Sequence, residues 1–323
     1  MVSRPVVLMS LLAWTAIAPA QPTPTMIDVG YAEPARLAVA PGQVVTIFVR
    51  NLNLDSGVTD RFPPPDTLAG VSVRYSDGAS SDPVEGLLPI FAVEPLDCER
   101  RTDGRCDLTA VTVQMPTGIK PCRPTLSPIP QDCTPELVLS LAEFGLVQQV
   151  LRFPLVPSKV HILNTCDTSV RPFLEPPAPL CFPLITHADG QLVTGVSPAQ
   201  AGESLTLYAV GMGSLAGAPP AGEATPAPPP LLAFPEDYGI TVGFDLRPGA
   251  PPTPPETPGV TAARPFFAGL APGQVGVYQL NFTVPQIEPE ELLPCGGSPG
   301  GINATLTVAM PGSLDAASLC LEP

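Results

Sequence analysis

The chain has 323 residues, a formal net charge of −15 at pH 7, and 47 prolines. Proline is about three times as frequent as in ordinary globular proteins, which excludes long helices over most of the chain. Hydrophobic residues make up 44% and charged residues only 14%, and this composition favours a folded chain over a disordered one. At roughly 100 to 200 residues per domain, the length predicts two domains.

Residues 1–20 have the features of a secretory signal peptide. Arg4 precedes an apolar run from Val6 to Ala18, and Ala18-Pro19-Ala20 forms a small-x-small cleavage site. The run is shorter than the ~20 apolar residues that a membrane anchor needs, and no other apolar segment approaches that length. We therefore expect a secreted protein, extracellular or periplasmic, without membrane insertion.

Loss of Arg4 with the leader would move the formal charge from −15 to −16. Nucleic acids and anionic lipid surfaces are bound through patches of lysine and arginine, and Lys120 and Lys159 are the only lysines. The sequence therefore predicts no nucleic-acid partner, and the acidity is explained by solubility alone.

Short segments with period-2 alternation of β-branched and aromatic residues recur along the chain, each bounded by Gly, Pro or Asp. They predict strands over residues 44–49, 71–75, 108–115, 205–208, 240–244 and 277–284. Short strands at this spacing are typical of β-sandwiches, so the predicted fold class is all-β, with immunoglobulin-like sandwiches, Pro-rich loops and disulfides.

The two halves of the chain repeat each other. Gly42, Thr46, Ile47, Phe48 and Leu52 correspond to Gly202, Thr206, Leu207, Tyr208 and Met212 at an offset of 160. Residues 89–92 correspond in the same way to 265–268, and residues 111–116 to 280–285. The offset differs among these three correspondences, as it does when loops of one copy carry insertions. The sequence therefore predicts two tandem copies of one sandwich.

Residues 136–150 fit either an amphipathic helix or strands, because their apolar positions are dense enough for both periods. Their counterpart in the second copy, residues 304–309, alternates as a strand before Pro311-Gly312. We therefore predict a hairpin of residues 137–141 and 147–153 that turns at 143–145.

These patterns divide the chain into a signal peptide (1–20), a first sandwich (26–160), a connector (161–190) and a second sandwich (191–323). The connector contains five prolines together with Cys166 and Cys181, so we expect it to be stiff and bridged.

All eight cysteines follow the leader, and an even number in an exported chain predicts disulfides. Eight cysteines allow 105 pairings, and order along the chain suggests that neighbours pair. The expected pairs are Cys98 with Cys106, Cys122 with Cys133, Cys166 with Cys181, and Cys295 with Cys320. Zinc is the rival interpretation, but it requires C-x2-C spacing with clustered histidines, and neither is present.

Two segments of the second copy carry a family resemblance. They run from Ser197-Pro198-Ala199-Gln200-Ala201-Gly202 to Gly213, and from Phe267-Ala268-Gly269-Leu270-Ala271-Pro272-Gly273 to Pro285. They resemble an uncharacterised family of C-terminal domains of secreted acidobacterial proteins, which is similar to the immunoglobulin-like IPT/TIG fold. The resemblance covers mainly residues 190–312. It implies fold and export, and it supplies no catalytic residue.

No residue pattern predicts catalysis, a cofactor or a metal site. Gly296-Gly297-Ser298-Pro299-Gly300 matches a hydrolase elbow by letter, but Pro299 has no N–H to offer an oxyanion hole. Asp189-Gly190, after His187, is typical of a turn. Three other groups of acids remain as weak candidates: Glu288, Glu290 and Glu291 as paired carboxylates, and Asp55/Asp60 and Asp103/Asp107 for calcium.

The sequence therefore predicts a non-catalytic secreted interaction, adhesion or scaffold protein, not an enzyme, whose partner is an extracellular protein or a polysaccharide. The alternative is an extracellular glycan-active enzyme or a carbohydrate-binding module that uses carboxylates between the sandwiches. A carbohydrate-binding module usually presents exposed aromatic rings for stacking, and the only tryptophan, Trp14, lies in the leader.

Overall fold

A computed structural model describes most of the chain after the expected leader. The described residues are 24–35, 37–52, 57–58, 63–77, 85–96, 108–119, 136–143, 146–167, 181–227, 233–288, 292–295 and 302–323. Within these ranges the regular structure is strand, apart from one short 3-10 turn, η2 (Glu236–Tyr238). No helix in the same ranges is long and apolar enough to cross a membrane.

The strands of residues 25–154 form two antiparallel sheets. They are β1 (Thr25–Gly30), β2 (Pro34–Ala35), β3 (Val44–Arg50), β4 (Gly57–Val58), β5 (Thr67–Leu68), β6 (Val71–Asp77), β7 (Glu85–Leu87), β8 (Ile90–Pro95), β9 (Thr109–Gln114), β10 (Glu136–Glu143) and β11 (Leu146–Pro154). One sheet has the order β2-β1-β3-β9-β8-β4, and the other has the order β11-β10-β6-β5 with β7 also paired to β6.

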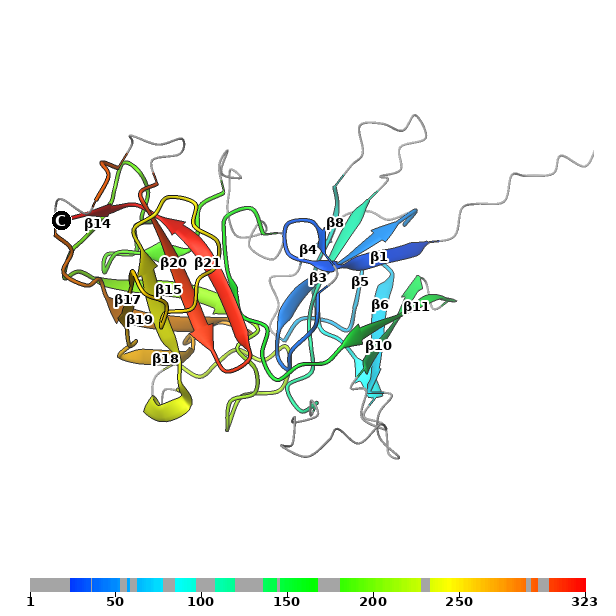
Figure 1. Cartoon of the computed structure of the whole chain (residues 1–323). Helices are drawn as coiled ribbons and strands as arrows, with labels where there is room; N and C mark the ends of the chain where they lie inside the picture. The colour runs from blue at the N-terminus through cyan, green and yellow to red at the C-terminus, as the bar shows by residue number, and fades with distance from the viewer. Residues whose placement is uncertain are drawn as a thin grey trace, which may run out of the picture.

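The strands of residues 161–322 form a second pair of sheets beside the first (Figure 1). They are β12 (His161–Ile162), β13 (Ile185–Thr186), β14 (Ala199–Gln200), β15 (Ser204–Val210), β16 (Thr241–Asp245), β17 (Val260–Ala263), β18 (Phe267–Leu270), β19 (Tyr278–Thr283), β20 (Ala304–Met310), β21 (Ser313–Leu319) and β22 (Leu321–Glu322). The orders are β12-β15-β19-β18, with β13 also on β15, and β17-β16-β20-β21; β14 and β22 form a small parallel pair.

The two halves repeat down to single residue pairs. Ile47 of β3 lies opposite Val111 of β9, and the corresponding residues of the second half, Leu207 and Leu280, also lie opposite each other. A parallel bridge between Val39 and Leu155 has its counterpart in the β14–β22 pair. The prediction of an all-β chain built from two sandwiches is confirmed.

Each sandwich buries one apolar core between its two sheets. In the first, Val45 and Ile47 of β3 share a cluster with Val73 of β6 and Leu141 of β10. In the second, the rings of Phe244 on β16 and Phe282 on β19 meet edge to face across the core with centroids 5.9 Å apart. Alternating strands supply these side chains because every second residue faces inward.

The ambiguous segment after residue 135 is the predicted hairpin. β10 and β11 pair from Glu136 with Pro154 to Glu143 with Leu146, with a register shift after Leu141. β10 also pairs with β6, as β20 pairs with β16 in the second half. β10 thus forms backbone hydrogen bonds with a strand on each side, which stabilises the extended conformation over a helix in this segment.

Residues 161–190, expected as a connector, contribute strands to the second sandwich. Both β12 and β13 pair with β15, and Cys166 is bonded to Cys181 between them. Cys295 is bonded to Cys320, next to β22. Two of the four expected disulfides are therefore present, while Cys98, Cys106, Cys122 and Cys133 lie outside the described residues.

Replacing both Cys166 and Cys181 with Ser should lower the free energy of unfolding by about 3 kcal/mol, because the bridge closes a loop with a sequence separation of 15. Chemical denaturation of the oxidised protein measures the loss. The pair Cys295 and Cys320 serves as the comparison, since its separation of 25 predicts a slightly larger loss on the same chain-entropy account. A loss near zero for both pairs would contradict that account.

Candidate functional site

The two sandwiches meet through faces that most antiparallel sheets leave to water. All residues of β9, and all of β3 except Arg50, are buried. Their inward side chains fill the first core, while Val44 on the opposite face of β3 packs with Leu163 and Val210 of the second half. A strand buried on both faces needs a second covering layer, and the second sandwich supplies part of it.

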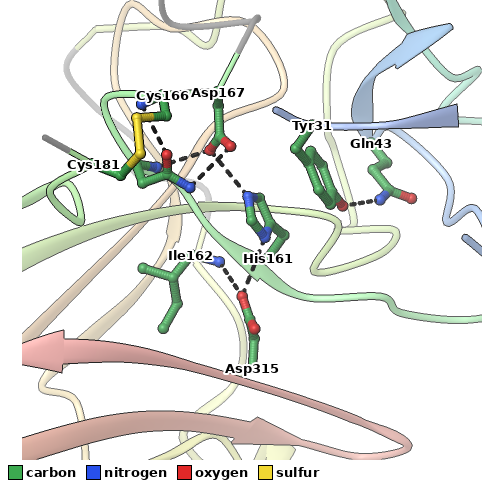
Figure 2. A network of polar contacts seen from close by, with 9 residues as sticks. Tyr31, Gln43, His161, Ile162, Cys166, Asp167, Cys181 and Asp315 are labelled. Atoms are coloured by element: carbon green, nitrogen blue, oxygen red, sulfur yellow. Dashed lines mark hydrogen bonds and ion pairs between the residues drawn. A yellow bond between two sulfur atoms is a disulfide. The ribbon is translucent and has the colours of Figure 1, made fainter. Parts of the chain in front are cut away.

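The polar centre of this contact is the His161 cluster, formed by Tyr31, Gln43, His161, Asp167 and Asp315 (Figure 2). His161 lies on β12 and Asp315 on β21, whereas Tyr31 follows β1 of the first sandwich. The Tyr31 and His161 rings are stacked, with centroids 3.6 Å apart and planes 9° from parallel. Gln43 donates a hydrogen bond to the Tyr31 hydroxyl, which ties the ring to the first sandwich.

Both ring nitrogens of His161 face carboxylates. Nε2 lies 3.0 Å from Oδ2 of Asp167, and Nδ1 lies 3.3 Å from Oδ2 of Asp315. The Asp167 side chain is only 1% exposed. Asp315 also accepts a hydrogen bond from the backbone N–H of Ile162 at 2.7 Å, which fixes it beside β12.

Local turn chemistry holds Asp167 in place. Its carboxylate accepts hydrogen bonds from the backbone N–H of Asn164 at 2.8 Å and from the Asn164 side-chain amide at 2.9 Å. The Asn164 side-chain oxygen accepts from the Cys166 N–H in turn, and Cys166 is bonded to Cys181. The disulfide therefore fixes the turn that presents Asp167 to His161.

The surroundings of His161 favour its charged form. Burial alone would lower its pKa, but hydrogen bonds and charge attraction from Asp167 and Asp315 outweigh that effect and raise the pKa from 6.5 to about 9. Burial also raises the pKa of Tyr31, so its ring remains a neutral phenol. The pair is thus an imidazolium stacked on an aromatic ring, a favourable cation–π arrangement. Both ring nitrogens face carboxylate oxygens, which is the arrangement expected for the protonated ring.

Gln114 forms a second bridge between the halves. Its side-chain amide donates to the carbonyl of Gly42 at 3.1 Å, and its side-chain oxygen accepts from the backbone N–H of Gly222 at 2.6 Å. Gly222 belongs to the Pro-rich segment 218–227 of the second sandwich, and it lies against Pro64 and Pro89 of the first. This Pro-rich loop is therefore an internal contact between the two sandwiches.

The backbone of Gly276 lies close to the first sandwich. It has a φ of 66°, and a Cβ built there would lie 2.6 Å from Nε2 of Gln114 and 2.8 Å from Cγ2 of Val44. Only glycine satisfies both the backbone angle and the space.

A cavity of about 320 Å³ lies between the sandwiches beside these contacts. Val44, Phe91 and Thr112 line it from the first sandwich, and Tyr208, Val210 and Val277 are among the residues that line it from the second. Tyr31 packs against the apolar cluster of Val44, Leu163 and Val210, and these three residues also line the cavity. The His161 cluster thus adjoins this cavity.

A second histidine site has the outline of a catalytic triad. Nδ1 of His187 lies 2.6 Å from Oε1 of Glu203, and Nε2 lies 3.2 Å from Oγ of Ser197. Nε2 is equally close to the Ser197 backbone carbonyl, which only accepts hydrogen bonds. Burial lowers the pKa of His187, but hydrogen bonds to Glu203 and the Ser197 carbonyl outweigh burial, so the pKa lies above its ordinary value. A hydrogen bond from Nε2 to this carbonyl needs the proton on Nε2, and a protonated Nε2 does not take a proton from Ser197. We therefore interpret the group as a structural contact between residues 187, 197 and 203.

The structure separates the remaining candidate residues. Asp189 accepts a hydrogen bond from the Gln191 N–H at 2.9 Å, and Gly190 has a φ of 86°, so the predicted turn is present and His187 pairs with Glu203 instead. Glu288 is exposed. Other candidates lie outside the described residues: Ser298, Glu290, Glu291, Asp55, Asp60, Asp103 and Asp107. In the described ranges, no group of three His, Cys, Asp or Glu side chains is placed to hold a metal ion.

Sequence reasoning missed the His161 cluster, although one signal for the contact exists. Residues 44–49 and 109–114 are apolar or uncharged at almost every position instead of alternating with charged residues, which indicates a strand covered on both faces. That signal identifies the covered sheet. It cannot identify Asp315 as the partner of His161, because the two are far apart along the chain.

Comparisons with known proteins assign no family. No protein family matches the sequence, and no curated protein matches it significantly. A crystal structure of red sea bream transglutaminase aligns over 93% of this chain and 32% of its own length, with 10% identity and a TM-score of 0.19. The chain thus spans about a third of that protein, and a likeness this weak carries no argument about function.

The free energy of unfolding should fall by up to about 3 kcal/mol between pH 6.5 and pH 9. Folded His161 keeps its proton through this range, whereas a histidine in the unfolded chain has lost it, so the stabilisation is complete below 6.5 and disappears as the pH passes 9. Urea denaturation at a series of pH values measures the slope. His161→Gln should flatten it, whereas His187→Gln should retain the His161 contribution; equal slopes for wild type and His161→Gln would refute the assignment.

Gly276→Ala should destabilise the protein more than Gly273→Ala. Both glycines have positive φ, at 66° and 75°, so both variants carry a strain of about 1 to 2 kcal/mol. A Cβ at Gly273 meets nothing within 4 Å, whereas one at Gly276 overlaps Gln114 and Val44 and should cost about 1 to 3 kcal/mol more. Chemical denaturation compares the two variants, and equal losses would show that the halves do not approach each other here.

Proposed function

We propose that this chain is a non-catalytic, exported interaction or scaffold protein whose two sandwiches form one rigid unit. The observation that carries the proposal is the His161 cluster, in which Asp167 and Asp315 flank His161 within the second half and the His161 ring stacks on Tyr31 of the first. Charges used in this way stabilise a fixed geometry and are not free to act on a substrate. A rigid pair of sandwiches suits a binding role because fixed surfaces lose less entropy when they bind.

Several features support export. The leader-like residues 1–20 favour secretion, and the bonds Cys166–Cys181 and Cys295–Cys320 persist in oxidising compartments such as the periplasm or the cell exterior. The proposed kinship with the secreted acidobacterial domain family points the same way. The excess of acidic residues, with a net charge of −15, favours a protein or polysaccharide partner over nucleic acid.

The test combines binding with turnover. The chain from Gln21 onward should bind saturably to cell envelope or to secreted polymer isolated from the native host, and it should release no product from a panel of glycans, esters and peptides. His161→Gln should weaken this binding because the sandwiches lose their fixed arrangement. His187→Gln, a matched variant away from the contact between the halves, should leave it unchanged.

Product release that disappears in Asp167→Asn or Asp315→Asn would overturn the proposal in favour of a glycan-active or other hydrolytic enzyme. Absence of saturable binding to every envelope and polymer fraction would also end it.

A further inference from the structure

The cavity between the sandwiches has the features of a small-molecule site. Its volume of about 320 Å³ falls within the range of known ligand pockets, and such pockets favour the boundaries between domains. Its walls come from central strands of both sandwiches, including β3 and β9 on one side and β15 and β19 on the other. The site therefore exists only where the two halves are joined.

The walls are held in place before any ligand arrives. On the first sandwich, Thr112 and Thr46 share a hydrogen bond of 3.2 Å, and both are almost completely buried. On the second, Gln279 donates a hydrogen bond from Nε2 to Oδ1 of Asn281 at 2.9 Å, which orients its amide. The stack of Tyr31 on His161 joins the two halves beside these walls. A preformed site of this kind loses little ordering entropy on binding.

The lining chemistry restricts the ligand. None of the described side chains that line the cavity is charged, and most are apolar. The hydroxyl of Tyr208 and the amides of Gln274 and Gln279 are the longer polar groups among them. A charged ligand would lose its hydration here without gaining an opposite charge, and the net charge of −15 also repels anions.

We propose that this cavity binds a small, uncharged, amphipathic molecule that has an apolar ring or short acyl body and one or two hydrogen-bonding groups. The apolar body lies against Val44, Val210 and Val277, and the polar groups meet Tyr208 or the two glutamines. This inference goes beyond the scaffold role, since it concerns a small ligand held between the two halves and not a macromolecular partner.

Two fluorescent probes that share an aromatic body but differ in charge test whether the cavity prefers an uncharged ligand. The probes are neutral N-phenyl-1-naphthylamine and anionic 8-anilinonaphthalene-1-sulfonate. The neutral probe should bind with one site per chain and a dissociation constant in the micromolar range, and the anionic probe should bind at least about tenfold more weakly.

Val277→Trp places a larger side chain in the cavity and should weaken binding of the neutral probe at least about tenfold. Val196→Trp is the matched control, because Val196 is 97% exposed and does not line the cavity. Gln279→Trp provides a second filling variant if Val277→Trp does not fold. Circular dichroism and thermal unfolding show which variants are folded.

Equal affinity for the two probes, binding without saturation, or equal affinity in Val196→Trp and a folded filling variant would each overturn the proposal. The assay uses neither envelope material nor enzyme substrates. Failure of the scaffold role therefore leaves this result unaffected, and failure here leaves the scaffold role untouched.

Discussion

The stacking of half-buried His161, whose neighbours favour its charged form, on Tyr31 is the interaction on which the arrangement of the two sandwiches depends. Burial would discharge His161 if it stood alone, but the nearby carboxylates of Asp167 and Asp315 keep it protonated. The stacked ring of Tyr31 connects this charge to the first sandwich. Each component has local support: a disulfide-bonded turn holds Asp167, the Ile162 N–H holds Asp315, and Gln43 holds Tyr31. Loss of His161 would leave the Asp167 carboxylate, which is 1% exposed, without a positive partner, so the members of the cluster depend on one another.

This contact explains features that are otherwise unconnected. β3 and β9 are buried on both faces because a second sandwich lies beyond them, and the cavity is the space that the two packed faces leave between them. Gly276 permits the close approach, and Gln114 joins the Pro-rich loop of one sandwich to the sheet of the other. Prolines suit such a loop, since a segment with fixed φ loses little entropy when it is held against a neighbour. The high proline content thus contributes to assembly of the two halves as well as to strand ends.

The sequence predicted most of the fold, because strand signals and repeats are local. The equivalence of residues 47 and 207, and of 111 and 280, is correct down to strand pairing. The pairing of β8 with β9 contains a register shift between Ile90 and Ala92, so this part of the first copy does not match the second pair for pair. No pattern in the sequence marks that bulge. The candidate site was not predictable in the same way. His161 meets Tyr31 and Asp315 from two distant segments as well as the nearby Asp167, and Asp315 looks in the sequence like any acid on an alternating strand. Tertiary packing brings such a cluster together, and no periodic pattern in a single sequence marks its members.

The central claim is that His161 is charged in the folded protein and holds the two sandwiches together. Direct titration of the imidazole by nuclear magnetic resonance tests it, and the spectrum is simple because the chain has only two histidines. A His187→Gln variant assigns the His161 signal without disturbing the contact between the halves. The account predicts a pKa of about 9 for His161. A value at or below the ordinary 6.5 would mean that the carboxylates do not hold the charge and would contradict the account.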